Sequence, residues 1–379
     1  MDLLEYQGKQ LFSRHGVPVP DGRHAATLDD AVAAANEIGY PCVVKAQVAI
    51  GKRGKAGGIK VAKDEAEARQ HSQTILGMDI RGFTVHDLWI EQASEIAAEY
   101  YASIILDRSE KKLLAMLSRM GGMDVEEMAE TDPEALVRRH IEPGVDLDAA
   151  VAREIAVDAG IDEDVTDQVA EMLVKLAEVT AAEDATLIEV NPLIVTGDRR
   201  VIALDAKVTI DNNALYRHEE LAELKDKSAE DPLEAMAKEK GLTYVKLDGN
   251  VGILANGAGL CMSTLDVVAQ AGGDPANFLD AGGGSKSEAI VDALEVITSD
   301  EKVTAILFNI FGGITRCDEI AKGIIEASQQ IEISSPLVVR LDGTNSEEGL
   351  ALLAEADLDN LHQEKTMLGA AERVVELAG

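Results

Sequence analysis

The stretch NVGILANGAGL, residues 250–260, is an apolar run of strand length followed directly by Gly257 and Gly259. A buried strand that ends in glycines and opens a helix is typical of parallel α/β units, whose sheet is covered on both faces. Further apolar runs of strand length, each with helical sequence behind it, follow at 276–284, 303–313 and 336–343. We therefore predict a doubly wound parallel sheet from residue 246 onward.

Glycines gather just past the strand in three of these four units, at 257 and 259, at 282–284, and at 312–313. Ligands of doubly wound folds bind at the carboxyl ends of the strands, and backbone N–H groups exposed there can hold an anion. A tight turn alone would explain any one of these glycine clusters. The dinucleotide fingerprint fails because Met262 takes its third glycine position, which disfavours a nicotinamide cofactor.

The first half of the chain, to about residue 215, mixes helices with short strands. The predicted strands are 41–47, 88–91, 100–106, 112–117, 186–190 and 201–204. Apolar residues at 165, 169, 172, 176 and 179 predict one amphipathic core helix. Residues 216–245 are charged and poor in apolar residues, so we expect an exposed helical linker at a domain boundary.

A basic, glycine-rich loop stands out in the first half. No acidic residue occurs from 38 to 63, and this stretch contains Lys45 and the sequence GKRGKAGG at 51–58. Glycines let backbone N–H groups approach an anion, and Lys45 at a strand end could reach a phosphate. The loop is not a Walker A sequence. We favour polyphosphate binding over the alternative of a solvated turn with incidental charge.

The sequence IEVNPLIVTGDRRVIALDAK, residues 188–207, predicts a hairpin that turns at TGDR. A turn centred on Asp198 places Asn191 opposite Asp205 and Glu189 opposite Lys207, with both pairs on one face. An Asn and an Asp side by side offer hard oxygen ligands for Mg²⁺ held jointly with nucleotide phosphates. An ordinary cross-strand polar pair explains this spacing equally well.

Composition excludes several classes of partner. The chain of 379 residues has a formal net charge of −34, which argues against nucleic acid or an anionic membrane surface. No apolar run is long enough for a transmembrane helix, and the N-terminal residues do not form a signal peptide. Three widely spaced cysteines indicate a reducing, cytoplasmic location. The acidic residues are spread along the chain, which suggests a surface adapted to high salt and a halophilic source.

No histidine lies in a glycine cluster and no serine in a nucleophile elbow, so a partner chain could supply the nucleophile. The motifs resemble those of a known family, the β subunits of succinyl-CoA synthetase (succinate–CoA ligase, ADP-forming). The matching segments occur in order along the whole chain: LLEYQGKQLF, VVKAQVAIGKRGKAGGIKV, IEVNPL, LDAKV, DPLEAMA, LDGNVGILANGAGLCMSTLD, NFLDAGGG, FNIFGGITRCDEIAKGII and VVRLDGTN.

The resemblance implies an ATP-grasp fold for residues 1–237 and a flavodoxin-like CoA-ligase domain for residues 238–379. It implies the reversible conversion of succinate, CoA and ATP into succinyl-CoA, ADP and phosphate. The reaction would pass through succinyl phosphate and a phosphohistidine on an α subunit, in a heterodimer or an α2β2 heterotetramer. CoA would bind mostly on the α subunit.

The resemblance also implies roles for individual residues. Mg²⁺ would be held by Asn191 and Asp205, and Glu189 would be the catalytic residue that orients the α-subunit histidine. The nucleotide, ATP or ADP, would contact Lys45, Lys52, Arg53, Gly54, Glu91, Ser94 and Glu99. The carboxylate substrate would contact Asn256, Gly313, Ile314 and Thr315.

Alternatives to this interpretation stay open. The β subunit of malate–CoA ligase has the same architecture and differs only in the carboxylate. A free-standing ATP-grasp ligase would need no partner, and a non-catalytic nucleotide- or CoA-binding regulator would need no metal ligands. Lys52 stands where the family commonly has glycine, and Pro20 weakly favours ATP over GTP.

Overall fold

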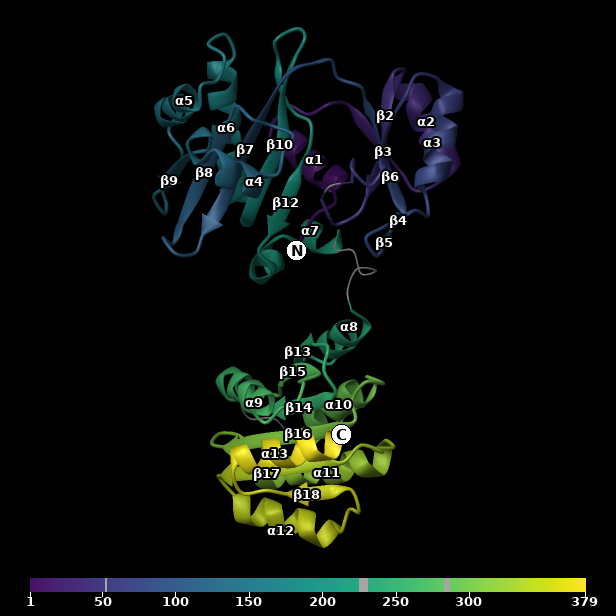
Figure 1. Cartoon of the computed structure of the whole chain (residues 1–379), viewed down its shortest axis with the longest axis vertical. Helices are drawn as coiled ribbons and strands as arrows, with labels where there is room; N and C mark the ends of the chain where they lie inside the picture. The colour runs from purple at the N-terminus through teal and green to yellow at the C-terminus, as the bar shows by residue number, and fades with distance from the viewer. Residues whose placement is uncertain (52, 225–230, 283–286) are drawn as a thin grey trace. The chain divides into compact units, whose positions relative to one another are not determined.

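The computed structural model describes residues 1–51, 53–224, 231–282 and 287–379. Its chain divides into two units, Met1–Ala229 and Glu230–Gly379 (Figure 1). Within the described ranges, no helix combines the length and the apolar character needed to cross a bilayer.

The first unit contains a four-stranded antiparallel sheet in the order β1-β6-β2-β3. Its strands are β1 (Gly22–Ala25), β6 (Asp87–Gln92), β2 (Cys42–Gln47) and β3 (Ile59–Ala62). Helices α2 (Leu28–Ile38) and α3 (Glu65–Ile75) cover one face (Figure 1). Val44 and Ala46 of β2 are buried in the core of this lobe. Because side chains alternate along a strand, Lys45 and Gln47 point to the opposite face.

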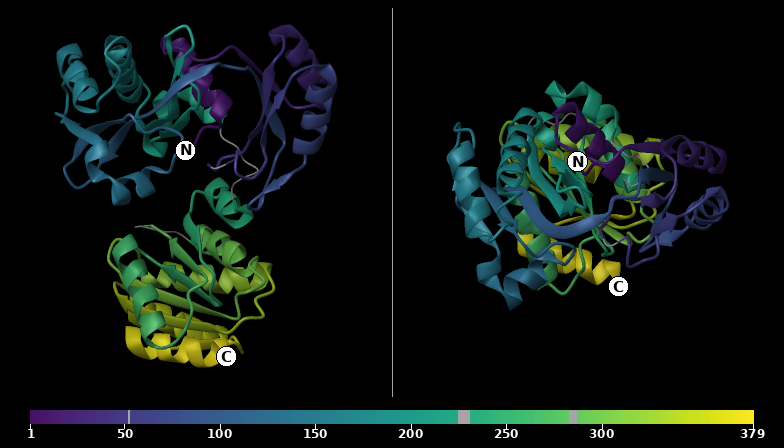
Figure 2. Two further views of the ribbon diagram at one scale, coloured as in Figure 1. Left: turned by 45° about the horizontal axis from the view of Figure 1, so that its top comes forward. Right: turned by 90° about the horizontal axis from the view of Figure 1, so that it is seen from above.

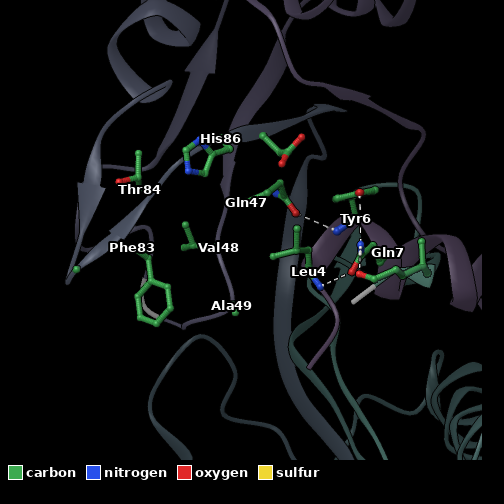
Figure 3. Close-up of a pocket in the computed structure, with 12 residues that line it drawn as sticks. Leu4, Tyr6, Gln7, Gln47, Val48, Ala49, Phe83, Thr84 and His86 are labelled. Carbon is green, nitrogen blue, oxygen red and sulfur yellow. Dashed lines mark hydrogen bonds between the residues drawn. The ribbon is translucent and has the colours of Figure 1, made fainter. Parts of the chain in front are cut away.

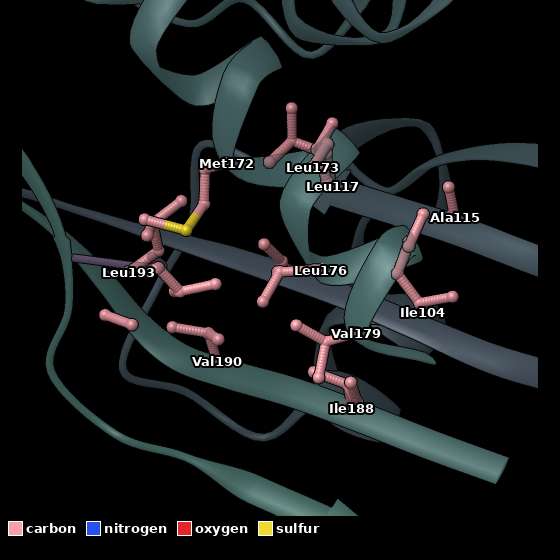
Figure 4. Close-up of a cluster of buried hydrophobic side chains, with 14 of the residues drawn as sticks. Ile104, Ala115, Leu117, Met172, Leu173, Leu176, Val179, Ile188, Val190 and Leu193 are labelled. Carbon is pink, nitrogen blue, oxygen red and sulfur yellow. The ribbon is translucent and has the colours of Figure 1, made fainter. Parts of the chain in front are cut away.

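A larger sheet of the first unit has the order β11-β10-β7-β8-β9, with β12 also paired to β10. The strands are β7 (Ile96–Asp107), β8 (Lys112–Ser118), β9 (Val137–Ile141), β10 (Ala185–Thr196), β11 (Val201–Ala203) and β12 (Lys207–Ile210). Helix α6 (Thr166–Ala182) lies on this sheet beside α5 (Ala149–Asp158). Figure 4 shows Met172, Leu176 and Val179 of α6 against Ile188 and Val190 of β10. The predicted apolar stripe and strands of this half are confirmed.

Helix α1 (Glu5–Arg14) connects the two sheets of the first unit. Its Leu11 and Phe12 belong to the core of the larger sheet, whereas its Glu5 forms a salt bridge to Lys45 on β2 of the smaller sheet. The helix starts with a cap in which the Leu4 N–H donates to Gln7 Oε1 at 2.9 Å. Shorter elements complete the unit: β4 (Asp79–Ile80), β5 (Phe83–Thr84), α4 (Val125–Thr131), η1 (Pro133–Ala135), η2 (Asn212–Arg217) and α7 (Glu219–Glu223).

The second unit has one sheet in the order β13-β15-β14-β16-β17-β18, parallel except for β13. The strands are β13 (Thr243–Lys246), β14 (Val251–Ala255), β15 (Asn277–Asp280), β16 (Ala305–Gly312), β17 (Leu337–Gly343) and β18 (Leu361–Gln363). Counted along the chain, the parallel strands follow the flavodoxin-like order 2-1-3-4-5.

Helices cover both faces of this sheet, as the views in Figure 2 show. Helices α9 (Ala258–Gln270) and α13 (Met367–Ala378) bury one apolar layer, which includes Ile253 and Leu307. Helices α10 (Ser287–Thr298), α11 (Cys317–Gln330) and α12 (Ser346–Ala356) bury the other, which includes Leu254 and Phe308. Neighbouring residues of one strand thus face opposite cores, and the predicted doubly wound sheet is confirmed.

The expectation of an exposed linker up to residue 245 is wrong for its last part. Helix α8 (Pro232–Glu239) and strand β13 belong to the second unit, where Ala237 and Tyr244 are buried in the core. Three apolar residues at 233, 236 and 237 give α8 one narrow stripe, which the many charged neighbours conceal in the sequence. The sequence-based division after residue 237 falls within this helix, and residues 225–230 of the expected linker lie outside the described residues.

Candidate functional site

The hairpin of β10 with β11 and β12 has the predicted register. Before Asn191 along β10, Glu189 pairs with Lys207 of β12; after it, Leu193 pairs with Ala203 of β11. The turn closes where the Arg199 N–H donates to the Thr196 carbonyl at 2.9 Å. Because the residue pairs before and after Asn191 have the same register, Asn191 and Asp205 lie opposite each other, between the β10–β12 and β10–β11 pairings.

Asn191 and Asp205 line one cavity of about 540 Å³, together with Glu189 and Arg53. The Asn191 Oδ1 accepts the Gly122 N–H at 2.8 Å, and its Nδ2 donates to the Met123 carbonyl at 2.9 Å. These bonds fix the amide orientation and leave Oδ1 a second lone pair.

The Asp205 Oδ1 accepts the Ala206 N–H at 2.8 Å and Arg53 Nη2 at 3.2 Å. An amide oxygen and a carboxylate are hard ligands that fit Mg²⁺. No group of three or more His, Cys, Asp or Glu side chains within the described ranges is placed to hold a metal ion. A cation here would therefore need further oxygens from phosphates and water.

Glu99 is brought close to Asn191 by the segment that follows β8. The Gly121 N–H donates to the Glu99 carbonyl at 3.1 Å, and Gly122 bonds Asn191. Gly122 has a φ of +74°, and a Cβ there would lie 2.6 Å from Glu99 Oε2. The positive φ favours glycine at position 122, and a side chain there would also displace the Glu99 carboxylate.

Beside the cavity lies a group of charged side chains that we call the buried charge cluster, consisting of Glu5, Lys9, Lys45, Arg53 and Glu91. Glu5 and Arg53 line the cavity, whereas Lys45, Lys9 and Glu91 do not. In sequence order, the exposed fractions of the cluster's side chains are 3, 1, 6, 7 and 0%. They come from α1, β2, the glycine-rich loop and β6, so the cluster joins four segments of the first unit. Buried charges of this kind are tolerated only when they are paired.

The two carboxylates of the buried charge cluster share its three cations. Glu5 Oε1 lies 2.9 Å from both Lys9 Nζ and Lys45 Nζ, and Glu5 Oε2 lies 2.7 Å from Arg53 Nη1. Glu91 Oε1 lies 2.8 Å from Lys45 Nζ, while Glu91 Oε2 binds Lys9 and accepts the Trp89 indole N–H at 2.9 Å.

Burial alone would raise the pKa of Glu5, but Arg53, Lys45 and Lys9 together hold this pKa well below its usual range. Burial would likewise lower the pKa of Lys45, and the neighbouring Glu5 and Glu91 raise it instead. The cluster therefore keeps Glu5 and Lys45 ionised despite their burial.

Sequence reasoning missed Glu5 and Lys9. They stand four residues apart on α1, a spacing that ordinarily marks a solvent-exposed helical ion pair. The sequence offers one signal against that interpretation, because the pair lies between the apolar residues Leu3, Leu4, Leu11 and Phe12.

The other residues expected at the nucleotide differ in how far they are buried. Gly54 is exposed in the glycine-rich loop, and Lys52 lies outside the described residues. Glu91 is fully buried under Lys9 and Lys45. Ser94 is half-buried after β6, and the structure gives it no polar contact with the other expected site residues that it describes.

Glu189 lies at the edge of the cavity, half-buried. Its Oε2 is 3.3 Å from the hydroxyl of the buried Tyr101, which is also 3.0 Å from Ser103 Oγ. Burial raises the pKa of Glu189, and the opposing Lys207 counteracts this shift. A half-buried carboxylate of this kind can hold an imidazole in a fixed tautomer.

The second unit brings Asn256, Gly313, Ile314 and Thr315 together at the carboxyl edge of its sheet. Asn256 follows β14, and the other three follow the adjacent strand β16. The Asn256 Nδ2 donates to the Phe311 carbonyl at 2.8 Å, and its Oδ1 accepts the Phe311 N–H at 2.9 Å. Thr315 is 2% exposed and Ile314 is 88% exposed. Strands β14 and β16 flank the switch point of the sheet, where ligands of this fold bind.

A second cavity of the first unit, of about 410 Å³, shares Val48, Ala49 and Phe83 with the first one. Figure 3 shows Tyr6 and Gln7 on one side of it and Thr84 and His86 on the other. None of its lining residues, all within the described ranges, is an expected site residue.

Comparisons with known proteins cover the whole chain. The ATP-grasp domain family matches residues 2–195, and the CoA-ligase family matches residues 254–374. The chain is 52% identical over 378 residues to succinate–CoA ligase (ADP-forming) subunit beta of Rubrobacter xylanophilus. It is 50% identical over 379 residues to the subunits of the same name from Natronomonas pharaonis and Halorubrum lacusprofundi. In each case the match covers 100% of this chain and 99% of the relative.

Among solved structures, ATP citrate lyase of Methanothrix soehngenii in complex with citrate and coenzyme A is similar in fold. It superposes with a TM-score of 0.77 at 21% identity, over 100% of this chain and 98% of that one. At this identity the likeness concerns the fold alone, and it agrees with an ATP-grasp domain followed by a CoA-ligase domain.

Proposed function

Because the chain belongs to the family of β subunits of ADP-forming succinate–CoA ligases, enzymes that form a carbon–sulfur bond, we propose how its two units share the work. The first unit binds ATP or ADP with Mg²⁺, and the second contributes to the site of the carboxylate. The observation that carries this proposal is one cavity of the first unit, which is lined by Asn191, Asp205 and Arg53 of the glycine-rich loop.

Lys45 and Arg53 supply the positive charge that nucleotide phosphates need, as a point charge and as a planar fork of donors. Mg²⁺ held by Asn191 and Asp205 would neutralise part of the phosphate charge when bound. Glu99, next to Asn191, would contact the ribose, and Glu189 would orient a histidine that arrives from the partner.

We propose that this partner is an α subunit, in a heterodimer or an α2β2 heterotetramer, and that it carries the phosphohistidine and most of the CoA site. Asn256 and residues 313–315 would then hold succinate at the carboxyl edge of the second sheet. The three relatives named above are all succinate–CoA ligases, so the comparisons do not favour malate as the substrate. Three buried free cysteines support a reducing cytoplasm as the location.

Asp205→Ala tests the metal site most sharply. Isothermal titration with ADP, with and without Mg²⁺, is expected to show Mg²⁺-dependent binding by the native chain. The variant should lose at least about tenfold of that affinity, which corresponds to about 1.4 kcal/mol. Asp198→Ala is the matched control, because Asp198 is an exposed aspartate at the turn of the same hairpin. Unchanged Mg²⁺-dependent affinity in Asp205→Ala, with its fold intact, would contradict the assignment.

A further inference from the structure

Glu5 of α1 lies at the centre of the cations that would meet the phosphates. Each of its oxygens binds a different one: Oε1 lies 2.9 Å from Lys45 Nζ, and Oε2 lies 2.7 Å from Arg53 Nη1. Lys45 is on β2, whereas Arg53 is on the glycine-rich loop. One carboxylate therefore bridges two cations that come from different segments of the chain.

Arg53 has further partners that aim its guanidinium. Its Nη1 also donates to the Ala46 carbonyl at 3.2 Å, and its Nη2 lies 3.2 Å from Asp205 Oδ1. The arginine thus extends from Glu5 to Asp205, an expected metal ligand, and all three residues line the cavity. Loss of Glu5 would remove one of the three partners that orient the Arg53 guanidinium.

Lys9 offsets the charge of this arrangement. Its ammonium group bridges Glu5 and Glu91, and all three side chains are nearly fully buried. With Asp205 included, three carboxylates face three cations and the formal charge is zero. Lys9 therefore offsets the charge of one carboxylate, so that Glu5 and Glu91 can both lie beside Lys45 without an uncompensated buried charge.

Helix α1 is itself held firmly, so Glu5 has a fixed position. The Tyr6 N–H donates to Gln47 Oε1 of β2 at 3.0 Å (Figure 3). Gly8 lies against the start of β12, where a Cβ would come within 3.1 Å of the Ala206 Cβ. These contacts tie α1 to both sheets of the first unit, so the helix that carries Glu5 is held by contacts other than those with the glycine-rich loop.

We propose that Glu5, held in place by Lys9, is a positioning residue that sets Lys45 and Arg53 for the nucleotide phosphates. This inference rests on the proposed function of the first unit. Neither Glu5 nor Lys9 need touch the nucleotide, because both act through the two cations.

Glu5→Gln separates positioning from simple charge. The substitution removes one negative charge, so electrostatics alone would tighten polyphosphate binding. Loss of positioning has the opposite sign, since a neutral amide cannot hold both cations. We expect MgADP affinity, measured by titration calorimetry on the full chain, to fall at least about tenfold.

The matched control is Glu220→Gln, since the exposed Glu220 also pairs with a residue of α1, Arg14 at 2.8 Å. Its MgADP affinity should equal that of the native chain. Equal or tighter binding by Glu5→Gln would overturn the inference, whereas absence of MgADP binding by the native chain would instead overturn the proposed function.

A second variant covers the case in which Glu5→Gln does not fold. Glu5→Gln with Lys9→Met removes the ion pair as a unit and restores formal neutrality, which favours folding. We expect this double variant to unfold cooperatively and still to bind MgADP at least about tenfold more weakly. Native affinity in the folded double variant would show that the pair has a structural role only.

Discussion

Glu91→Gln tests how the buried charge cluster contributes to stability. Glu91 is fully buried, forms salt bridges with Lys9 and Lys45, and accepts the Trp89 indole N–H. The amide keeps the shape but leaves two buried ammonium groups to share Glu5. Removing one partner of a buried ion pair costs about 3–5 kcal/mol. For a unit of this size, about 2–4 °C per kcal/mol predicts a midpoint lower by roughly 6–20 °C.

Trp89 makes the measurement specific, because it is the only tryptophan of the chain and touches Glu91. Thermal unfolding followed by its fluorescence, at one fixed salt concentration, reports on the first unit. Glu220→Gln serves as the control, since Glu220 is 84% exposed and its pair should contribute about 0–1 kcal/mol. Equal midpoints for the two variants would refute the reasoning.

Two other predictions concern the hydrophobic core under α6 and the loss of stability at acidic pH. Leu176→Ala, in the core under α6, should cost about 2–5 kcal/mol in urea unfolding. Val157→Ala, on the exposed face of α5, should stay within about 0.5 kcal/mol, and similar losses would contradict the core assignment. Arg316, followed by Asn345, holds the pKa of Asp318 below its usual range despite burial. A lowered folded pKa adds stability above the unfolded value of about 3.9, and this stability is lost as the pH falls further. The stability gap between the native chain and Asp318→Asn, measured by urea unfolding with circular dichroism, should therefore narrow below about pH 4, and a constant gap would contradict this cause.

Much of the second unit could be predicted from its sequence. Buried parallel strands have near-continuous apolar runs, and the glycines at 257 and 313 mark the strand ends at the switch point. The sequence could not show that β13 joins the sheet, because an antiparallel edge strand of four residues has only Tyr244 buried. Charged residues dominate its neighbourhood and imitate a linker.

The hairpin of the first unit was equally predictable, because its turn sets the register and places Asn191 opposite Asp205. The buried charge cluster was not. Its members come from positions 5 to 91, and a charged residue in a sequence predicts exposure unless its partners are known. Only the fold shows that Glu5 contacts Lys9, Lys45 and Arg53. The proposed adaptation to high salt stays a prediction.

The most direct measurement of the central claim is an assay of ADP formation in high-salt buffer, with the chain alone and with a co-expressed α subunit. The reactions contain ATP, Mg²⁺ and CoA with either succinate or malate. We expect ADP release that depends on succinate, on CoA and on the presence of both chains. Release by this chain alone would contradict the shared site and favour a self-sufficient ligase, and release with malate but not succinate would contradict the proposed substrate.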